Sequence, residues 1–232
     1  MTILFVLATP GSVFLAGDSR QFPTRDDTRK KVFLVGKDAL IAQGGVGVIP
    51  SVRPDGGPWD ALSTLNGIVD RTGAAEFGKQ LEFIAKEFGE RFADVLSRFH
   101  EVIRREPPAK IDMFFVKRTS NRRVYVAYQE FHVRSKEDPG GRWQHEMELG
   151  VPQIKLDGIK LRNEAIRTYW SAPFGCAVET RKAGPINRGQ EAAWITKLVR
   201  GVAAQSEQCS AQIGGTIRVA TVDNKGARWL VP

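Results

Sequence analysis

The sequence predicts an α+β fold, built as a four-layer αββα sandwich of two antiparallel sheets with helices on both outer sides. The first observation is that apolar segments come in pairs separated by turn sequences, which is typical of antiparallel hairpins. The second is that several of these segments are apolar without alternation, so both sheet faces should be buried. The third is that segments with helical periodicity fall in blocks between the strands and do not alternate with them.

Two hairpins are expected in the first 45 residues. The turn residues Thr9-Pro10-Gly11-Ser12 separate the first pair of apolar runs, and Gly36-Lys37-Asp38 separates the second. The expected strands are 3–8, 13–16, 31–35 and 39–43.

Helices are expected next. Pro58 suits the first position of a helix over 59–70, because its missing N–H has no partner there in any case. From Ala74, eight apolar residues recur every three or four positions and form one helical stripe before Pro107-Pro108 end it. They are Phe77, Leu81, Ile84, Phe88, Phe92, Val95, Phe99 and Val102.

The second half is expected to return to strands and then to alternate once more between helices and strands. A polar segment over 134–158 is predicted to be irregular. The expected strands are 111–116, 124–128, 216–222 and 227–231, and the expected helices are 163–170 and 190–205.

Composition fits a single globular domain over residues 1–232, with 42% hydrophobic and 26% charged residues. No apolar run reaches the ~18 residues of a membrane span, and the N-terminus has no basic region of the kind that precedes a signal sequence. Cys176 and Cys209 share no CxxC spacing, so they are predicted to be buried or incidental thiols. A cytoplasmic protein is expected.

The net charge of +8 raises the question of a nucleic-acid partner. The basic residues are scattered in pairs, such as Lys30-Lys31 and Arg104-Arg105, and do not form one stripe. Such pairs more often lie at strand ends or helix termini, so nucleic-acid binding is disfavoured.

No metal or cofactor is expected. The three histidines lack the spacing of metal ligands, and the glycines over 44–47 complete neither a dinucleotide-binding nor a phosphate-binding motif. The sequence also has no GxSxG nucleophile motif.

Thr2 is the strongest catalytic candidate. Methionine before a small residue is normally removed, so the mature chain would begin at Thr2. The hydroxyl of an N-terminal threonine is a nucleophile, and its own α-amine, with a pKa of about 7.7–8.0, can be the base. The alternative is that Thr2 simply opens a strand as a good β-former.

The spacing around Thr2 favours the catalytic interpretation. Gly17-Asp18-Ser19-Arg20 places an aspartate sixteen residues after Thr2, Lys31 opens the next strand, and Gly45 follows fourteen residues later. This pattern resembles the proteasome β-subunit family of N-terminal-nucleophile hydrolases. Among bacterial relatives the chain is most similar to the β-proteobacterial proteasome homologue group, with the group called Anbu as runner-up. The motifs span residues 2–47, and the later order of elements, with a Gly214-Gly215 step, agrees over most of the chain.

The resemblance implies the N-terminal-nucleophile hydrolase fold and a set of site roles. Thr2 would be the nucleophile, Lys31 would lie beside its hydroxyl, and Asp18 would pair with Lys31. The backbone N–H of Gly45 would serve the oxyanion hole. The family's Asp-x-x-Ser-Gly element has its nearest match at Ser210, where this sequence lacks the carboxylate.

The resemblance also implies a pocket for the residue before the scissile bond. Its positions correspond to Gln21, Arg29, Phe33, Gln43 and Gly47. Because Arg29 and Gln43 make this pocket polar, acidic or polar residues are expected there.

The expected function is that of a threonine endopeptidase subunit that assembles into a ring, and into a double ring, and cleaves peptides or unfolded proteins inside it. An ATPase unfoldase is a candidate partner, and no membrane is expected to be involved. Two alternatives stay open: a non-proteolytic ring or scaffold protein, which retention of Met1 would favour, and a small-molecule amidohydrolase of the same nucleophile class.

Overall fold

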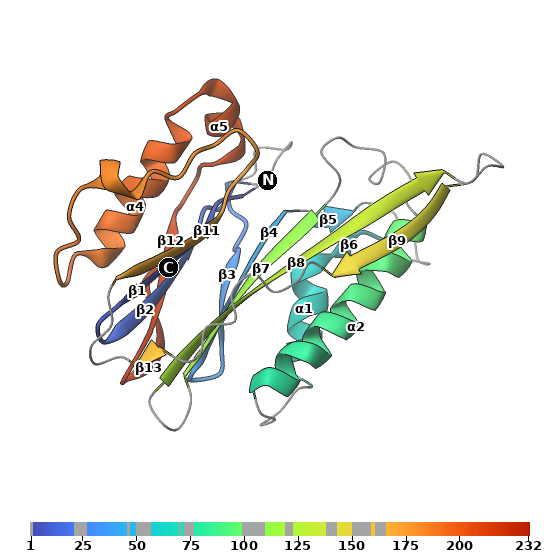
Figure 1. Ribbon diagram of the computed structural model, residues 1–232, viewed down its shortest axis with the longest axis horizontal. Coiled ribbons are helices and arrows are strands. Elements are labelled where there is room, and N and C mark those ends of the chain that lie inside the picture. The colour runs from blue at the N-terminus through green and yellow to red at the C-terminus, as the bar shows by residue number, and fades with distance from the viewer. Residues whose placement is uncertain are drawn as a thin grey trace. The chain divides into compact units, whose positions relative to one another are not determined.

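A computed structural model describes residues 2–20, 27–45, 47–49, 57–69, 71, 77–98, 110–118, 123–137, 143–149, 159–160 and 166–232. Its elements are helices and antiparallel sheets (Figure 1). The chain forms two compact units. The first unit comprises Met1–Gly44, Met113–Tyr128 and Ile154–Pro232, and the second comprises Gly45–Asp112 and Gln129–Gln153.

The first unit contains an antiparallel five-stranded sheet in the order β11-β1-β2-β12-β13. The strands are β1 (Leu4–Thr9), β2 (Ser12–Gly17), β11 (Arg167–Ser171), β12 (Arg218–Asp223) and β13 (Gly226–Val231). The two hairpins expected at the ends of the sequence, β1–β2 and β12–β13, are therefore confirmed, and the register brings them together through β2 and β12.

A second sheet has the order β10-β8-β7-β4-β3, with β9 paired to β8. The predicted pair β3–β4 is antiparallel, as are β8–β9 and β8–β10. The strands are β3 (Val32–Val35), β4 (Ala39–Gly45), β7 (Lys110–Arg118), β8 (Arg123–Glu137), β9 (Trp143–Leu149) and β10 (Ile159–Lys160).

In the first unit, α4 (Glu191–Ala203) and α5 (Glu207–Gln212) follow the short 3₁₀ helix η1 (Thr180–Ala183). The apolar face of α4, including Trp194, Ile195 and Leu198, packs against β1 and β2 in one buried cluster (Figure 1). Helical amphipathicity supplies this face, since the buried positions recur every three or four residues.

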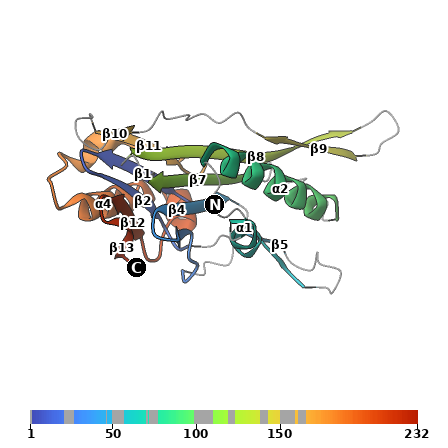
Figure 2. The ribbon, with the colours of Figure 1, turned by 90° about the horizontal axis from the view of Figure 1, so that it is seen from below.

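The second unit contains α1 (Ala61–Val69), α2 (Phe77–Arg98) and the short antiparallel pair β5 (Val48–Ile49) and β6 (Trp59–Asp60). Figure 2 shows α2 running beside the hairpin of β8 and β9, which it contacts. Phe88 of α2 packs its ring against Trp59, Phe92 and Phe131, at centroid distances of 6.0, 6.3 and 5.0 Å. Within the described residues, the expected aromatic stripe is thus a packing face at Phe88 and Phe92, whereas Phe99 and Val102 lie outside the described residues.

Strand β1 is buried on both faces, as its unbroken apolar sequence predicts. Alternate side chains point to opposite sides of a strand. Leu4 and Val6 join a cluster with strands of the second sheet, whereas Phe5 and Leu7 join the cluster under α4. The first unit therefore has two cores that share β1. One core lies between the helices and the five-stranded sheet, and the other lies between that sheet and strands of the second sheet.

Several element predictions are wrong. The segment predicted as helix 163–170 overlaps β11, whose Thr168, Tyr169 and Trp170 suit a strand, and β11 gives β1 its second neighbour. Residues 163–165 lie outside the described residues. Within the segment predicted to be irregular, β8 continues to Glu137 and β9 covers Trp143–Leu149.

Two helix predictions need smaller corrections. The helix expected over 59–70 begins at Ala61, because Trp59 and Asp60 pair with β5 and the Asp60 carboxylate accepts a hydrogen bond from the Ser63 N–H at 2.9 Å. The helix expected over 190–205 ends at Ala203. Helix α5, which was not predicted, follows it after Ser206, whose side chain caps it by accepting from Cys209 N–H at 3.1 Å.

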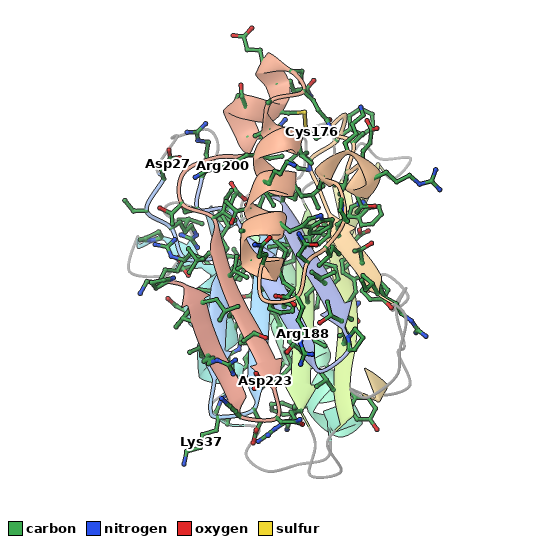
Figure 3. All side chains as sticks on the ribbon, turned by 90° about the vertical axis from the view of Figure 1, so that its left-hand side faces the viewer. Asp27, Lys37, Cys176, Arg188, Arg200 and Asp223 are labelled. Carbon is green, nitrogen blue, oxygen red and sulfur yellow. A yellow bond between two sulfur atoms is a disulfide. The ribbon has the colours of Figure 1, made fainter. Side chains whose placement is uncertain are left out.

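Cys176 and Cys209 are buried, as predicted, but the prediction that they are thiols is wrong, because they form a disulfide with a Cα–Cα distance of 5.8 Å. The two cysteines are 33 residues apart in sequence. Folding brings them together because Cys209 lies on α5 and Cys176 lies in the segment after β11. The bond, seen beside the Cys176 label in Figure 3, therefore ties α5 to that segment.

Among the described residues, no helix combines the length and apolarity needed to cross a membrane.

Reduction of the Cys176–Cys209 bond is expected to lower the free energy of unfolding by about 3–4 kcal/mol, because closing a loop of this length restricts the unfolded chain. Guanidinium unfolding with and without reductant measures the change. The double variant C176A/C209A is the control and should be insensitive to reductant. An unchanged midpoint after reduction verified by mass would contradict this expectation.

Candidate active site

Thr2 is separated from β1 by Ile3 alone and is 5% exposed. Its position is determined by its neighbour Ile3, whose backbone N–H donates a hydrogen bond to Asp18 Oδ1 at 3.1 Å. Because β1 is the second strand of its sheet and is paired on both sides, the backbone after Thr2 is held on both edges.

Asp18 follows the last residue of β2, and the pairing of Leu4 with Gly17 brings it beside the start of β1. Its carboxylate is 1% exposed. Besides Ile3 N–H, it accepts hydrogen bonds at Oδ2 from the N–H groups of Arg20 at 3.2 Å and Gly214 at 3.1 Å. Three chain segments therefore meet at one buried carboxylate.

Lys31 lies directly before β3 and is 6% exposed. Its Nζ donates to Thr2 Oγ1 and to the backbone carbonyl of Arg20, and it lies 3.5 Å from Asp18 Oδ1. An ammonium group has three N–H donors, and three oxygen acceptors surround this one. The arrangement therefore suits the protonated form and brings a positive charge against the Thr2 hydroxyl.

Burial acts on both charged groups of this pair. It lowers the pKa of Lys31 and raises the pKa of Asp18, because each charged form loses contact with water. The Lys31 charge and the three backbone N–H groups oppose the effect on Asp18, as the Asp18 charge opposes the effect on Lys31. Each group thus favours the charged form of the other.

Gly44 lies against Thr2 at the end of β4. A Cβ atom on Gly44 would lie 3.5 Å from Thr2 Cγ2 and 3.3 Å from Leu4 Cδ1, so a larger side chain would crowd the start of β1. Gly45, the next residue, is half-buried with φ +84°, a backbone conformation that favours glycine. The second unit begins at Gly45.

The Gly214-Gly215 step lies beside Asp18 Oδ2, the carboxylate oxygen that Ile3 does not bind. The Gly214 carbonyl accepts hydrogen bonds from Ser19 N–H and Arg20 N–H, both at 3.2 Å, while its own N–H binds Asp18. Gly215 has φ +69°. The turn between α5 and β12 is thus joined to the Asp18-Ser19-Arg20 segment by reciprocal hydrogen bonds.

Ser210 is exposed on α5, and its hydroxyl donates to the Glu207 carbonyl at 2.9 Å. Its backbone carbonyl accepts a hydrogen bond from Arg20 Nη1 at 2.6 Å. Ser210 is therefore connected to the Asp18 segment through its main chain.

The residues expected to line a substrate pocket differ in burial and in the unit to which they belong. Gln21 lies outside the described residues. Arg29 is half-buried and two residues before Lys31, and Phe33 is half-buried on β3 opposite Ile41. Gln43 is 2% exposed and its Nε2 donates to the Gly44 carbonyl at 2.8 Å. In the second unit, the Gly47 carbonyl accepts from Ala61 N–H at 2.9 Å.

The structure thus brings together Thr2, Asp18 and Lys31 of the expected catalytic residues. Two further residues were not predicted from the sequence: Arg20, which binds Asp18 and Lys31 through its main chain, and Asp27, which binds the Arg20 side chain. The signal for Arg20 was available, because it ends the Asp-Ser-Arg motif. Nothing in the sequence singled out Asp27.

Comparisons of the sequence with protein-family models and with curated proteins find no match.

Replacing Asp18 by alanine is expected to destabilise the protein by about 3–5 kcal/mol, because Lys31 would remain buried without a counter-charge and three backbone N–H groups would lose their acceptor. K31M should cost less, since methionine fills the space without a charge and the backbone N–H groups still bind Asp18. Chemical denaturation of both variants measures the difference. A D18A variant as stable as the wild type would contradict the importance of this carboxylate.

Proposed function

We propose that the protein is a threonine endopeptidase with mature N-terminal Thr2 as nucleophile, acting as a subunit of a self-compartmentalising ring. The proposal includes the four-layer αββα arrangement of N-terminal-nucleophile hydrolases. The three contacting layers of the first unit support it, as does the position of Thr2 two residues before a strand that is paired on both sides.

One observation carries the proposal: the hydrogen bond from Lys31 Nζ to Thr2 Oγ1 in a buried site that Asp18 completes. A hydroxyl needs activation to attack a peptide carbonyl. A cation beside the oxygen stabilises the negative charge that develops there as the proton leaves. A threonine that merely opened a strand would not require a buried lysine at its hydroxyl.

The proposed reaction begins after Met1 is removed. Thr2 Oγ attacks the peptide carbonyl carbon while its proton passes to the Thr2 α-amine, and the Gly45 N–H stabilises the resulting oxyanion. The C–N bond then breaks, the departing amine takes the proton, and an ester to Thr2 remains. Water, deprotonated by the same α-amine, hydrolyses this ester and regenerates the hydroxyl.

A homo-oligomeric ring, doubled into a closed chamber, would restrict substrates to peptides and unfolded chains, and an ATPase unfoldase would be its partner. We propose the cytoplasm as its compartment. Because cytoplasmic thiols are normally kept reduced, alkylation of Cys176 and Cys209 in freshly lysed cells tests that compartment separately from the activity.

The direct test is intact-mass measurement with and without a peptide epoxyketone, which reacts with both the hydroxyl and the amine of an N-terminal threonine. The wild type should lack Met1 and gain one inhibitor. The variant T2A should gain none and should lose peptide hydrolysis by a factor of at least about 10³. K31M should be processed but labelled far more slowly.

Three other results would contradict the proposal, in whole or in part. A chain that keeps Met1 and stays unlabelled would favour the ring or scaffold protein. Labelling without hydrolysis of any peptide would favour an amidohydrolase that acts on small molecules. Native mass spectrometry that finds only monomers would exclude the ring in either case.

Replacing Arg29 by alanine is expected to lower kcat/KM about tenfold or more for peptides with an acidic residue before the scissile bond, because a charge-assisted hydrogen bond would be lost. Fluorogenic peptides that differ only at that residue measure it. K30A, which removes the same charge from the exposed neighbouring residue, is the control. An unchanged ranking of peptides in R29A would remove Arg29 from the pocket.

A further inference from the structure

Arg20 contacts the candidate active site through its main chain. Its N–H donates to Asp18 Oδ2, and its carbonyl oxygen accepts a hydrogen bond from Lys31 Nζ. Of the three oxygens around the Lys31 ammonium, this carbonyl is the one that belongs to neither Thr2 nor Asp18. The orientation of the Arg20 peptide group therefore bears directly on where Lys31 points.

The Arg20 side chain is held from two sides. Nε and Nη2 donate to the two carboxylate oxygens of Asp27, both at 2.7 Å, and Nη1 donates to the Ser210 carbonyl at 2.6 Å. A bidentate pair of this kind restricts both the distance between the guanidinium and the carboxylate and the direction in which the guanidinium points. The guanidinium is consequently anchored to the segment before β3 and to α5 together.

Gly214 shows how closely the guanidinium is packed. A Cβ atom on Gly214 would lie 2.7 Å from Arg20 Nη1 and 2.8 Å from Nε, so a side chain at this position would displace the guanidinium. The same glycine donates its N–H to Asp18. The guanidinium therefore lies against the residue that completes the Asp18 site.

Asp27 binds this region through its main chain as well, since its carbonyl oxygen accepts a hydrogen bond from the Ser19 hydroxyl. That hydroxyl in turn accepts a hydrogen bond from Thr216 N–H at 2.8 Å. Asp27 and Lys31 are four residues apart and contact opposite ends of Arg20. Asp27 binds the guanidinium, and Lys31 binds the carbonyl.

We propose that the Asp27–Arg20 ion pair is a positioning element of the active site, which holds the Arg20 carbonyl where it orients the Lys31 ammonium toward Thr2. The proposal rests on the proposed function for its effect on catalysis. Arg20 and Asp27 act through Lys31 and need not touch the substrate.

The charge of Asp27 adds a second effect. Asp18 and Asp27 both favour the ammonium form of Lys31, whereas burial and the positive charge of Arg29 lower its pKa. Removing the Asp27 charge should thus lower the Lys31 pKa further, which a purely structural loop contact would not do.

The first unit contains a matched control. Asp223 and Arg228 form a bidentate pair at the same two distances of 2.7 Å. Asp223 pairs with Ser12 at the start of β2, whereas Asp18 follows its end. Figure 3 accordingly shows Asp27 and Asp223 at opposite ends of the first unit.

The experiment compares D27N and R20K with D223N and R228K in the full chain. D27N and R20K are expected to lower kcat, and the rate of epoxyketone labelling, by 10- to 100-fold with little change in KM, since misplacement of a catalytic group by about 1 Å has effects of this size. D27E should recover part of the rate by restoring a carboxylate. D223N and R228K should retain the wild-type rate.

A second measurement does not depend on activity. The Cε resonance of Lys31, assigned with K31M, is followed against pH by NMR in the wild type, D27N and D223N. D27N should move the titration midpoint to lower pH, and D223N should leave it unchanged. If D27N does not fold, D27S, which removes the same charge, is measured in its place.

The outcomes separate the two proposals. An unlabelled, inactive wild type whose Lys31 midpoint still moves in D27N would refute the peptidase and support the positioning of Lys31. An active wild type in which D27N and D223N have equal rates and equal Lys31 midpoints would overturn the positioning proposal and leave the peptidase standing. Equal loss in both pairs would likewise overturn it.

Discussion

The carboxylate of Asp18 is the constraint on which the rest of the first unit depends. It is buried, and it binds the backbone of three segments that are remote in sequence: the start of β1, the Asp-Ser-Arg segment and the turn before β12. A buried carboxylate is costly unless its hydrogen bonds are satisfied and a positive charge compensates it. Lys31 supplies that charge, so the segment before β3 becomes a fourth partner. Burial of Asp18 is therefore least costly when all four segments are in place.

This dependence joins stability to chemistry. The interactions that make burial of Asp18 tolerable are the same ones that bring Lys31 to the Thr2 hydroxyl. Around them, β1 contributes apolar side chains to two cores at once, so the strand that follows Thr2 has little freedom to shift. Rigid backbone on one side and a compensated charge pair on the other are what a preorganised nucleophile requires.

Much of this architecture could be predicted from local sequence. The hairpins β1–β2, β3–β4 and β12–β13 have strong turn residues, and α2 and α4 have clear helical periodicity. Strand β11 was missed because its five residues show no alternation, and it forms through pairing with β1. The Thr2–Asp18–Lys31 group was expected from spacing and a family resemblance, whereas Asp27 was not, since no sequence motif links it to Arg20. The disulfide was missed for the same reason: the two cysteines are 33 positions apart in sequence, and only the folded chain brings their Cα atoms to 5.8 Å.

That disulfide also bears on how the protein is handled. Cys209 neighbours Ser210, whose carbonyl holds the Arg20 guanidinium, so the cross-link stabilises the helix against which that guanidinium rests. Purification buffers that contain thiols would reduce the disulfide, and α5 would then be held in place only by noncovalent contacts. Preparations of one sequence made in different laboratories would then differ in covalent structure beside the site. The redox history of a sample is thus part of its chemical identity.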